Sequence, residues 1–125
     1  MSSALQITER TIDNVTIFEL TGDLVYDGGT RLLREALTRA VAAGARACLL
    51  DLDGITYLDS GGVGSLVAMF RHVTRRGGQL KLMRPSPNAR RVLGIARLTA
   101  VFEIFDDERE ALLNLGGAAP RKMES

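Results

Sequence analysis

The residue types best suited to chemistry lie between positions 57 and 65, where polar side chains meet a run of glycines. Ser60 directly follows Asp59, and glycines occupy positions 61, 62 and 64 ahead of a long apolar stretch. Such glycines leave the first-turn amides of a helix uncovered, and these amides with the helix dipole stabilise an anion by about 0.3–1 kcal/mol at a surface site. The pattern therefore favours a negative charge on Ser60, as phosphorylation would supply. The simpler interpretation is an N-cap serine, worth about 1 kcal/mol to the helix.

The sequence lacks residues that nucleotide binding, cofactor binding and hydrolysis each require. A phosphate-binding loop needs a lysine after its last glycine, none follows Gly64, and the glycine spacing also fails the dinucleotide fingerprint. His72 is the only histidine, so the chain has no Ser-His-acid arrangement. Asp51, Asp53 and Asp59 lack the nitrogen or sulphur ligands that favour zinc. A hard cation is the weaker alternative, since Asp51 and Asp53 are better explained as the end of a buried strand where it meets water. We therefore expect no enzyme, no cofactor and no metal.

Overall charge and hydropathy limit the partners of the chain. Its 125 residues are 46% hydrophobic, enough for one core, and 16 basic against 15 acidic side chains leave a net charge of +1. Because no field of one sign covers the surface, direct nucleic-acid binding is not expected. No apolar run reaches the roughly 20 residues of a membrane span, and the start has no signal-peptide pattern, which predicts a cytoplasmic protein without membrane insertion. The lone Cys48 lies in an apolar run and is expected in the core.

Periodic hydrophobicity divides the chain into strands and helices. Strands are expected where apolar residues alternate or run together, at 5–8, 15–20, 48–52, 80–83 and 101–105. Helices are expected where apolar residues recur at helical spacing, over 32–41 up to Gly44, over 61–76, from Pro87, and after a cap at Asp106 or Asp107. Asp13 and Asn14 supply the turn of an opening β-hairpin, and residues 53–59 are expected as a loop.

This order of elements predicts an α/β fold, in which a mixed sheet of about five strands has about four helices packed over it. We expect a single domain over 1–125, with 4–116 folded and 117–125 as a disordered tail. Arg71, Arg75 and Arg76 should lie on the polar face of the second helix, around His72. Such a face is usually only solvated, and its functional alternative is a docking surface for an acidic partner.

Three segments carry a resemblance to a known family. Residues 51–64 resemble the signature of STAS domains, named for sulphate transporters and anti-sigma factor antagonists. Residues 20–24 look like the loop after the second strand in that family, and residues 111–116 resemble the ending of its single-domain bacterial antagonists. The resemblance covers nearly the whole chain and implies the STAS fold.

The resemblance implies a switch. In the family, the serine directly after the aspartate is phosphorylated by a serine kinase that is itself the anti-sigma factor, and here that position is Ser60. Unphosphorylated, the protein would bind this kinase and release the sigma factor, and a phosphoserine phosphatase would reset it. Two positions depart from the family, since antagonists commonly have serine or threonine where this chain has Gly61 and often aspartate where it has Val25.

The implied partner surface joins the start of the second helix to the loop before the first. Its members are Gly22, Asp23, Leu24, Asp27, Asp59, Ser60, Gly61, Gly62, Val63 and Gly64. The alternative function is a STAS scaffold subunit of a lipid-transport or stress-signalling complex, which would dock through the same face without phosphorylation. The opening hairpin leaves an edge strand, so we expect a monomer or a weak homodimer.

Overall fold

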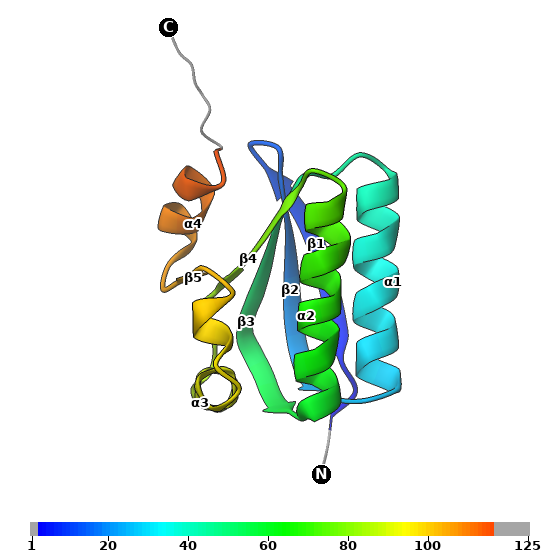
Figure 1. The fold of residues 1–125 in the computed structure, drawn as a ribbon, viewed down its shortest axis with the longest axis vertical. Helices are drawn as coiled ribbons and strands as arrows, with labels where there is room; N and C mark the ends of the chain where they lie inside the picture. Colours follow the sequence, from blue (N-terminus) through cyan, green and yellow to red (C-terminus); the bar gives the residue numbers. More distant parts are fainter. Residues whose placement is uncertain (1–2, 117–125) are drawn as a thin grey trace, which may run out of the picture.

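The computed structural model describes residues 3–116, which form one mixed β-sheet with helices on both faces (Figure 1). The five strands lie in the order β1-β2-β3-β4-β5, and only the β1–β2 pair is antiparallel. The predicted fold class is confirmed. The predicted domain bounds extend past the described residues at both ends, and the predicted tail at 117–125 lies wholly outside them.

The first two strands form the predicted hairpin. β1 (Gln6–Ile12) pairs with β2 (Val15–Leu24) across a two-residue turn. Asp13 and Asn14 both have positive φ, 50° and 68°, which is the backbone twist that joins antiparallel strands tightly. Asparagine and aspartate tolerate this conformation better than other non-glycine residues, so the turn follows directly from the sequence.

Two helices lie side by side over one face of the sheet (Figure 1). α1 (Gly28–Ala42) buries Leu33, Leu37 and neighbours, and α2 (Ser60–Arg75) buries Leu66, Met69 and Val73. They meet inward-facing residues of β2, β3 and β4 in the main core, which includes Cys48 as expected. Each fully buried leucine contributes about 1.5–3 kcal/mol relative to an exposed one. This packing fixes where both helices begin, and therefore where the candidate site lies.

The second half of the chain completes both faces. β4 (Gln79–Met83) leads to α3 (Pro87–Ile95), which begins with Pro87 as predicted and is capped by Ser86. α4 (Glu108–Asn114) is capped by Asp107, whose side chain accepts a hydrogen bond from the Glu110 N–H. α4 packs on the opposite face of the sheet, where it covers a smaller cluster that includes Val15, Ile17, Leu49 and Met83.

Several predicted element boundaries are wrong. β3 (Ala47–Leu58) continues to residue 58, through the predicted loop at 53–59, and β2 continues to Leu24 beside it. Pairing with β2 across two register shifts keeps the second half of β3 in the sheet despite Asp53 and Gly54, because the strand is held by backbone hydrogen bonds. β5 (Ile104–Phe105) has only two residues, because the turn that follows the short 3-10 helix η1 (Leu98–Ala100) takes up residues 101 and 102, the first part of the predicted strand. No helix in residues 3–116 is long and apolar enough to cross a bilayer.

Candidate functional site

Ser60 is the first residue of α2, and it is exposed at the surface of the molecule. The interpretation of Ser60 as the N-cap is wrong, because Asp59 holds that position. Its backbone is extended, with φ −104° and ψ −176°, and its Oδ1 accepts a hydrogen bond of 2.8 Å from the Gly62 N–H. An aspartate in this place satisfies one first-turn amide and complements the helix dipole. The Ser60 hydroxyl is therefore not needed as a cap.

The Asp59 carboxylate also ties α2 to the loop between β2 and α1. Its Oδ2 accepts a hydrogen bond of 3.3 Å from the Tyr26 N–H. One side chain thus fixes the starts of both helices relative to each other. The surface around Ser60 consequently includes the loop at 25–27, as the resemblance implied.

The glycines after Ser60 have a packing reason. A Cβ at Gly62 would lie 2.1 Å from the Leu24 carbonyl oxygen, and a Cβ at Gly61 would lie 2.7 Å from the Tyr26 Cβ. No atom lies within 4 Å of the Cβ position at Gly64. Two of the three glycines therefore let α2 approach the end of β2 and the loop after it closely.

Three residues of the predicted partner surface are buried and support the exposed part of the site. The Gly22 φ is +96°, and a Cβ there would lie 2.4 Å from the Ala4 carbonyl oxygen. Asp23 is buried, and its carboxylate accepts hydrogen bonds from the Ser3 N–H (3.0 Å) and the Thr56 hydroxyl (2.7 Å). The Leu24 side chain is 0% exposed. In this conformation these residues shape the end of β2, and a contact of their own with a partner stays a prediction.

The remaining predicted residues lie nearer the surface. Asp27 is exposed and precedes α1 with φ 76° and ψ −94°, a conformation that is strained for any residue except glycine. Val63 is half-buried and packs against the core, whereas Gly64 is exposed. The predicted set therefore comes together in space but divides into exposed and supporting members.

Sequence reasoning missed two aromatic residues at this end of the molecule. Tyr26 is 78% exposed and Tyr57 is 60% exposed. Tyr57 lies near the end of β3, where it pairs with Asp23 of β2. The available signal was the position of Tyr26 among turn-forming residues, directly before Asp27 and two glycines. Exposed tyrosines are common anchors of protein interfaces.

The acidic residues considered for a cation have another explanation. Asp51 is 4% exposed and pairs with Arg84 at 2.9 Å, so it does not meet water as expected, whereas Asp53 is exposed as expected. This pair, with the charge of Asp51 favouring the guanidinium, raises the pKa of Arg84. Residues 3–116 contain no group of three acidic, histidine or cysteine side chains placed to hold a metal ion. His72 is half-buried, and burial and the nearby Arg76 lower its pKa.

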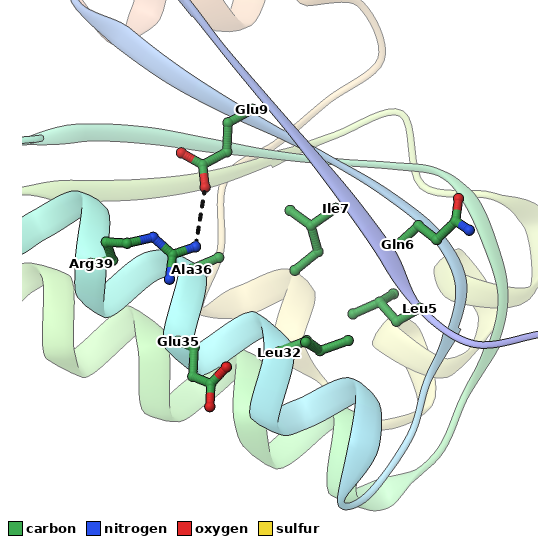
Figure 2. Close-up of a pocket in the computed structure, with 8 residues that line it drawn as sticks. All are labelled: Leu5, Gln6, Ile7, Glu9, Leu32, Glu35, Ala36 and Arg39. Atoms are coloured by element: carbon green, nitrogen blue, oxygen red, sulfur yellow. Dashed lines mark ion pairs between the residues drawn. The ribbon is translucent and has the colours of Figure 1, made fainter.

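A shallow groove of about 360 Å³ runs between β1 and α1, away from Ser60 (Figure 2). Leu5, Ile7 and the exposed Leu32 line its apolar part, and the Glu9–Arg39 ion pair of 3.8 Å bridges one end. The groove is open to solvent and contains no nucleophile or unpaired buried polar group that would suggest chemistry. The exposed serine at the start of α2 is therefore the better candidate site.

The sequence profile of the STAS domain matches residues 6–111. Together with the fold, this match means that the chain belongs to the STAS domain family. The anti-sigma F factor antagonist of Paenibacillus polymyxa is 26% identical over 114 residues, which cover 89% of this chain and 95% of that protein. The anti-sigma-B factor antagonist of Listeria monocytogenes is 30% identical over 110 residues, which cover 88% and 95%.

Solved structures share the fold. An anti-sigma factor antagonist from Mycobacterium paratuberculosis superposes with a TM-score of 0.80 at 20% identity, over 92% of this chain and 98% of that one. The antagonist SpoIIAA in its unphosphorylated form gives 0.74 at 23% identity, over 94% and 100%. The phosphorylated form of SpoIIAA, from Bacillus, gives 0.66 over 89% and 98%.

Proposed function

We propose that this chain is an anti-sigma factor antagonist, a cytoplasmic binding protein rather than an enzyme. The relatives that carry this name match it over nearly their whole length, which supports the transfer of function. The observation that carries the proposal is the exposed position of Ser60 at the first residue of α2, because a protein kinase must reach the hydroxyl from solvent.

In the unphosphorylated state, the exposed surface of Tyr26, Asp27, Ser60 and Gly64 docks on an anti-sigma serine kinase, which then releases its sigma factor. The Asp59 carboxylate holds the two segments of this surface in register through Gly62 and the loop at residue 26. A surface that is already ordered loses little conformational entropy on binding.

Phosphorylation of Ser60 ends the contact. A phosphoserine adds a charge of about −1.5 to −2 at pH 7 and would have to be desolvated in the same interface. The neighbouring carboxylates of Asp59 and Asp27 add like-charge repulsion across it. Within the domain, the amino end of α2 favours the new charge, so the switch acts on binding and leaves the fold intact. A phosphoserine phosphatase restores the binding form.

The proposal is tested by incubating the protein with ATP and a candidate anti-sigma kinase, followed by intact mass and peptide mapping. We expect one added phosphate on Ser60, none on Ser60→Ala, and at least about a tenfold loss of kinase affinity in Ser60→Asp. Ser65→Ala is the matched control, since Ser65 lies one turn further along α2 and donates to the Gly62 carbonyl oxygen. It should be phosphorylated like the unaltered protein.

Two outcomes contradict the proposal. Equal kinase affinity of Ser60→Asp and the unaltered protein would exclude the switch, as would an unfolded Ser60→Asp. Binding without any phosphate transfer would favour the scaffold function in a lipid-transport or stress-signalling complex. Gel filtration of the same samples tests whether the protein is a monomer or a weak homodimer.

A further inference from the structure

The outer surface formed by α1 and α2 carries a large excess of positive charge. From the start of α1 to residue 46, and along α2 to its C-cap, the only carboxylate is Glu35. The same segments contain seven arginines: Arg31, Arg34, Arg39, Arg46, Arg71, Arg75 and Arg76. The whole chain has a net charge of only +1, so its carboxylates are concentrated away from these two helices.

The fold accounts for three of these arginines. Arg39 pairs with Glu9 at 3.8 Å. Arg46 donates to the Ala45 carbonyl oxygen (2.9 Å), and Arg76 donates to the His72 carbonyl oxygen (3.2 Å), so both help to close helix ends. None of the remaining four arginines, Arg31, Arg34, Arg71 and Arg75, forms an ion pair with a carboxylate of residues 3–116.

Helix stability explains only part of this charge: Arg75 lies in the last turn of α2, where the helix dipole favours a cation. It does not explain Arg31 or the placement of Arg71 near Arg75. Arg31 lies near the start of α1, where the helix dipole is positive and an acidic residue would be favourable. Arg71 and Arg75 are four residues apart on α2, where two like charges repel each other. All four are exposed. Exposed positive charge that lacks an internal partner is better explained by an external one.

We propose that the α1–α2 surface binds an acidic protein surface, with Arg71 and Arg75, near the end of α2, as its main contacts and Arg31 and Arg34, near the start of α1, at the other end of the surface. Guanidinium groups fit carboxylates in a bidentate geometry, which gives this pairing direction as well as attraction. Arg71 lies about 16 Å along the α2 axis from Ser60, at 1.5 Å per residue. The contact through Arg71 and Arg75 is thus separate from the phosphorylation site and does not depend on phosphorylation.

The charge distribution favours a compact acidic partner over a membrane or a nucleic acid. Among the exposed large apolar side chains of the described residues, only Leu32 belongs to these helices, and a membrane-bound helix needs an apolar face to insert. An extended polyanion would also meet the carboxylate-rich remainder of the surface. An acidic patch on a protein is small enough to contact only the basic surface of the two helices.

The test uses the full chain and a fluorescein-labelled acidic peptide of about 20 residues, rich in glutamate, with fluorescence anisotropy as readout. We expect binding that weakens as salt rises. The double variant Arg71→Glu, Arg75→Glu should lose about tenfold in affinity, and Arg91→Glu, Arg109→Glu less than about twofold. The second variant is the matched control, because it makes the same charge change at exposed arginines of α3 and α4. Circular dichroism checks that both variants fold.

Amide chemical-shift changes on adding the peptide should fall on α1 and α2. Three results would overturn the inference: no binding of the peptide, equal weakening in both double variants, or shift changes elsewhere. Tighter binding of duplex DNA or of phosphatidylglycerol vesicles through Arg71 and Arg75 would also overturn it, since the surface would then serve another class of partner.

Discussion

Gly61 and Tyr26 lie so close together that a Cβ at position 61 would be 2.7 Å from the Tyr26 Cβ and 3.0 Å from its Cα. The Tyr26 Cα belongs to the backbone and the Tyr26 Cβ is bonded to it, so rotation of the tyrosine side chain cannot relieve the contact. The start of α2 can therefore pack this closely against the loop before α1 only because Gly61 has no side chain.

The first prediction follows from this fit. Gly61→Ala should lower the free energy of unfolding by about 1–3 kcal/mol, because the loop at residue 26 must move away from α2. Urea unfolding followed by circular dichroism measures the change. The same result is expected for Gly61→Ser, which restores the residue type common in the family.

Gly64→Ala is the control for this prediction. It lies in the same helix with no atom within 4 Å of the Cβ position, so it should raise the free energy of unfolding by about 0.5–1 kcal/mol through helix propensity alone. If both substitutions shifted stability in the same direction, the close approach to Tyr26 would not be what selects glycine at position 61.

The second prediction concerns the Asp59 carboxylate. Asp59→Ala removes the acceptor of both the Gly62 and the Tyr26 N–H groups and should cost about 0.5–2 kcal/mol of stability. Hydrogen exchange at the Tyr26 amide should become faster than in the unaltered protein. Asp107→Ala removes a comparable cap from α4 and should leave that amide unchanged. Equal exchange rates at residue 26 in all three proteins would mean that Asp59 does not hold the loop.

The fold class was predictable because its signals are local. Asp13 and Asn14 specify the hairpin turn, and Pro87 and Asp107 mark the starts of α3 and α4. The second half of β3 was not predictable, since the turn formers Asp53 and Gly54 interrupt the apolar run, and pairing with β2 continues the strand past them. The sequence pattern alone does not show that β2 pairs with this part of β3.

The candidate site was predictable in position but not in construction. Ser60 was placed correctly at the start of a helix, but the cap was assigned to it rather than to Asp59. Both residue types are good caps, and the choice depends on which backbone is extended. The burial of Asp23 and Leu24 depends on residues 3–5 crossing the end of β2, a contact between segments that pattern analysis does not connect.

The third prediction is a pH dependence. The hydrogen bond and charge of Arg10 lower the pKa of Glu108 below its ordinary value. A carboxyl group with a lower pKa in the folded state binds fewer protons there than when unfolded, so stability rises with pH. Its contribution is complete above the unfolded pKa, near 4.5, and is lost as pH falls through the folded value.

Unfolding free energies measured from pH 7 down to about 3 test this dependence. The unaltered protein should lose more stability over this range than Glu108→Gln, by about 0.5–1 kcal/mol, because the pair is partly exposed. Glu110→Gln is the control, an exposed residue of the same helix, and should follow the unaltered protein. Parallel curves for all three proteins would contradict the assigned role of the Arg10–Glu108 pair.

The fourth prediction concerns the single thiol. Burial raises the pKa of Cys48 to about 11, and the residue lies in the core. Iodoacetamide at pH 8 should therefore leave the folded protein unmodified by intact mass and alkylate it fully in concentrated urea, since the thiolate is the nucleophile. Rapid alkylation of the folded protein would mean that the core around β3 opens readily.

The fifth prediction rests on the exposed ring of Tyr26 and on the proposed function. Tyr26→Ala should weaken binding to the anti-sigma kinase by about tenfold or more, as expected for an aromatic anchor. The unfolding free energy should change by less than about 0.5 kcal/mol, because the hydrogen bond to Asp59 uses the main chain and survives the substitution.

Ile95→Ala is the control for this experiment, since Ile95 is also a large exposed apolar side chain but lies at the end of α3. It should bind the kinase like the unaltered protein. If Tyr26→Ala also bound like the unaltered protein while Ser60→Asp did not, the interface would include the start of α2 without the ring of Tyr26. The close fit between Gly61 and Tyr26 would then serve only to hold α2 against the end of β2.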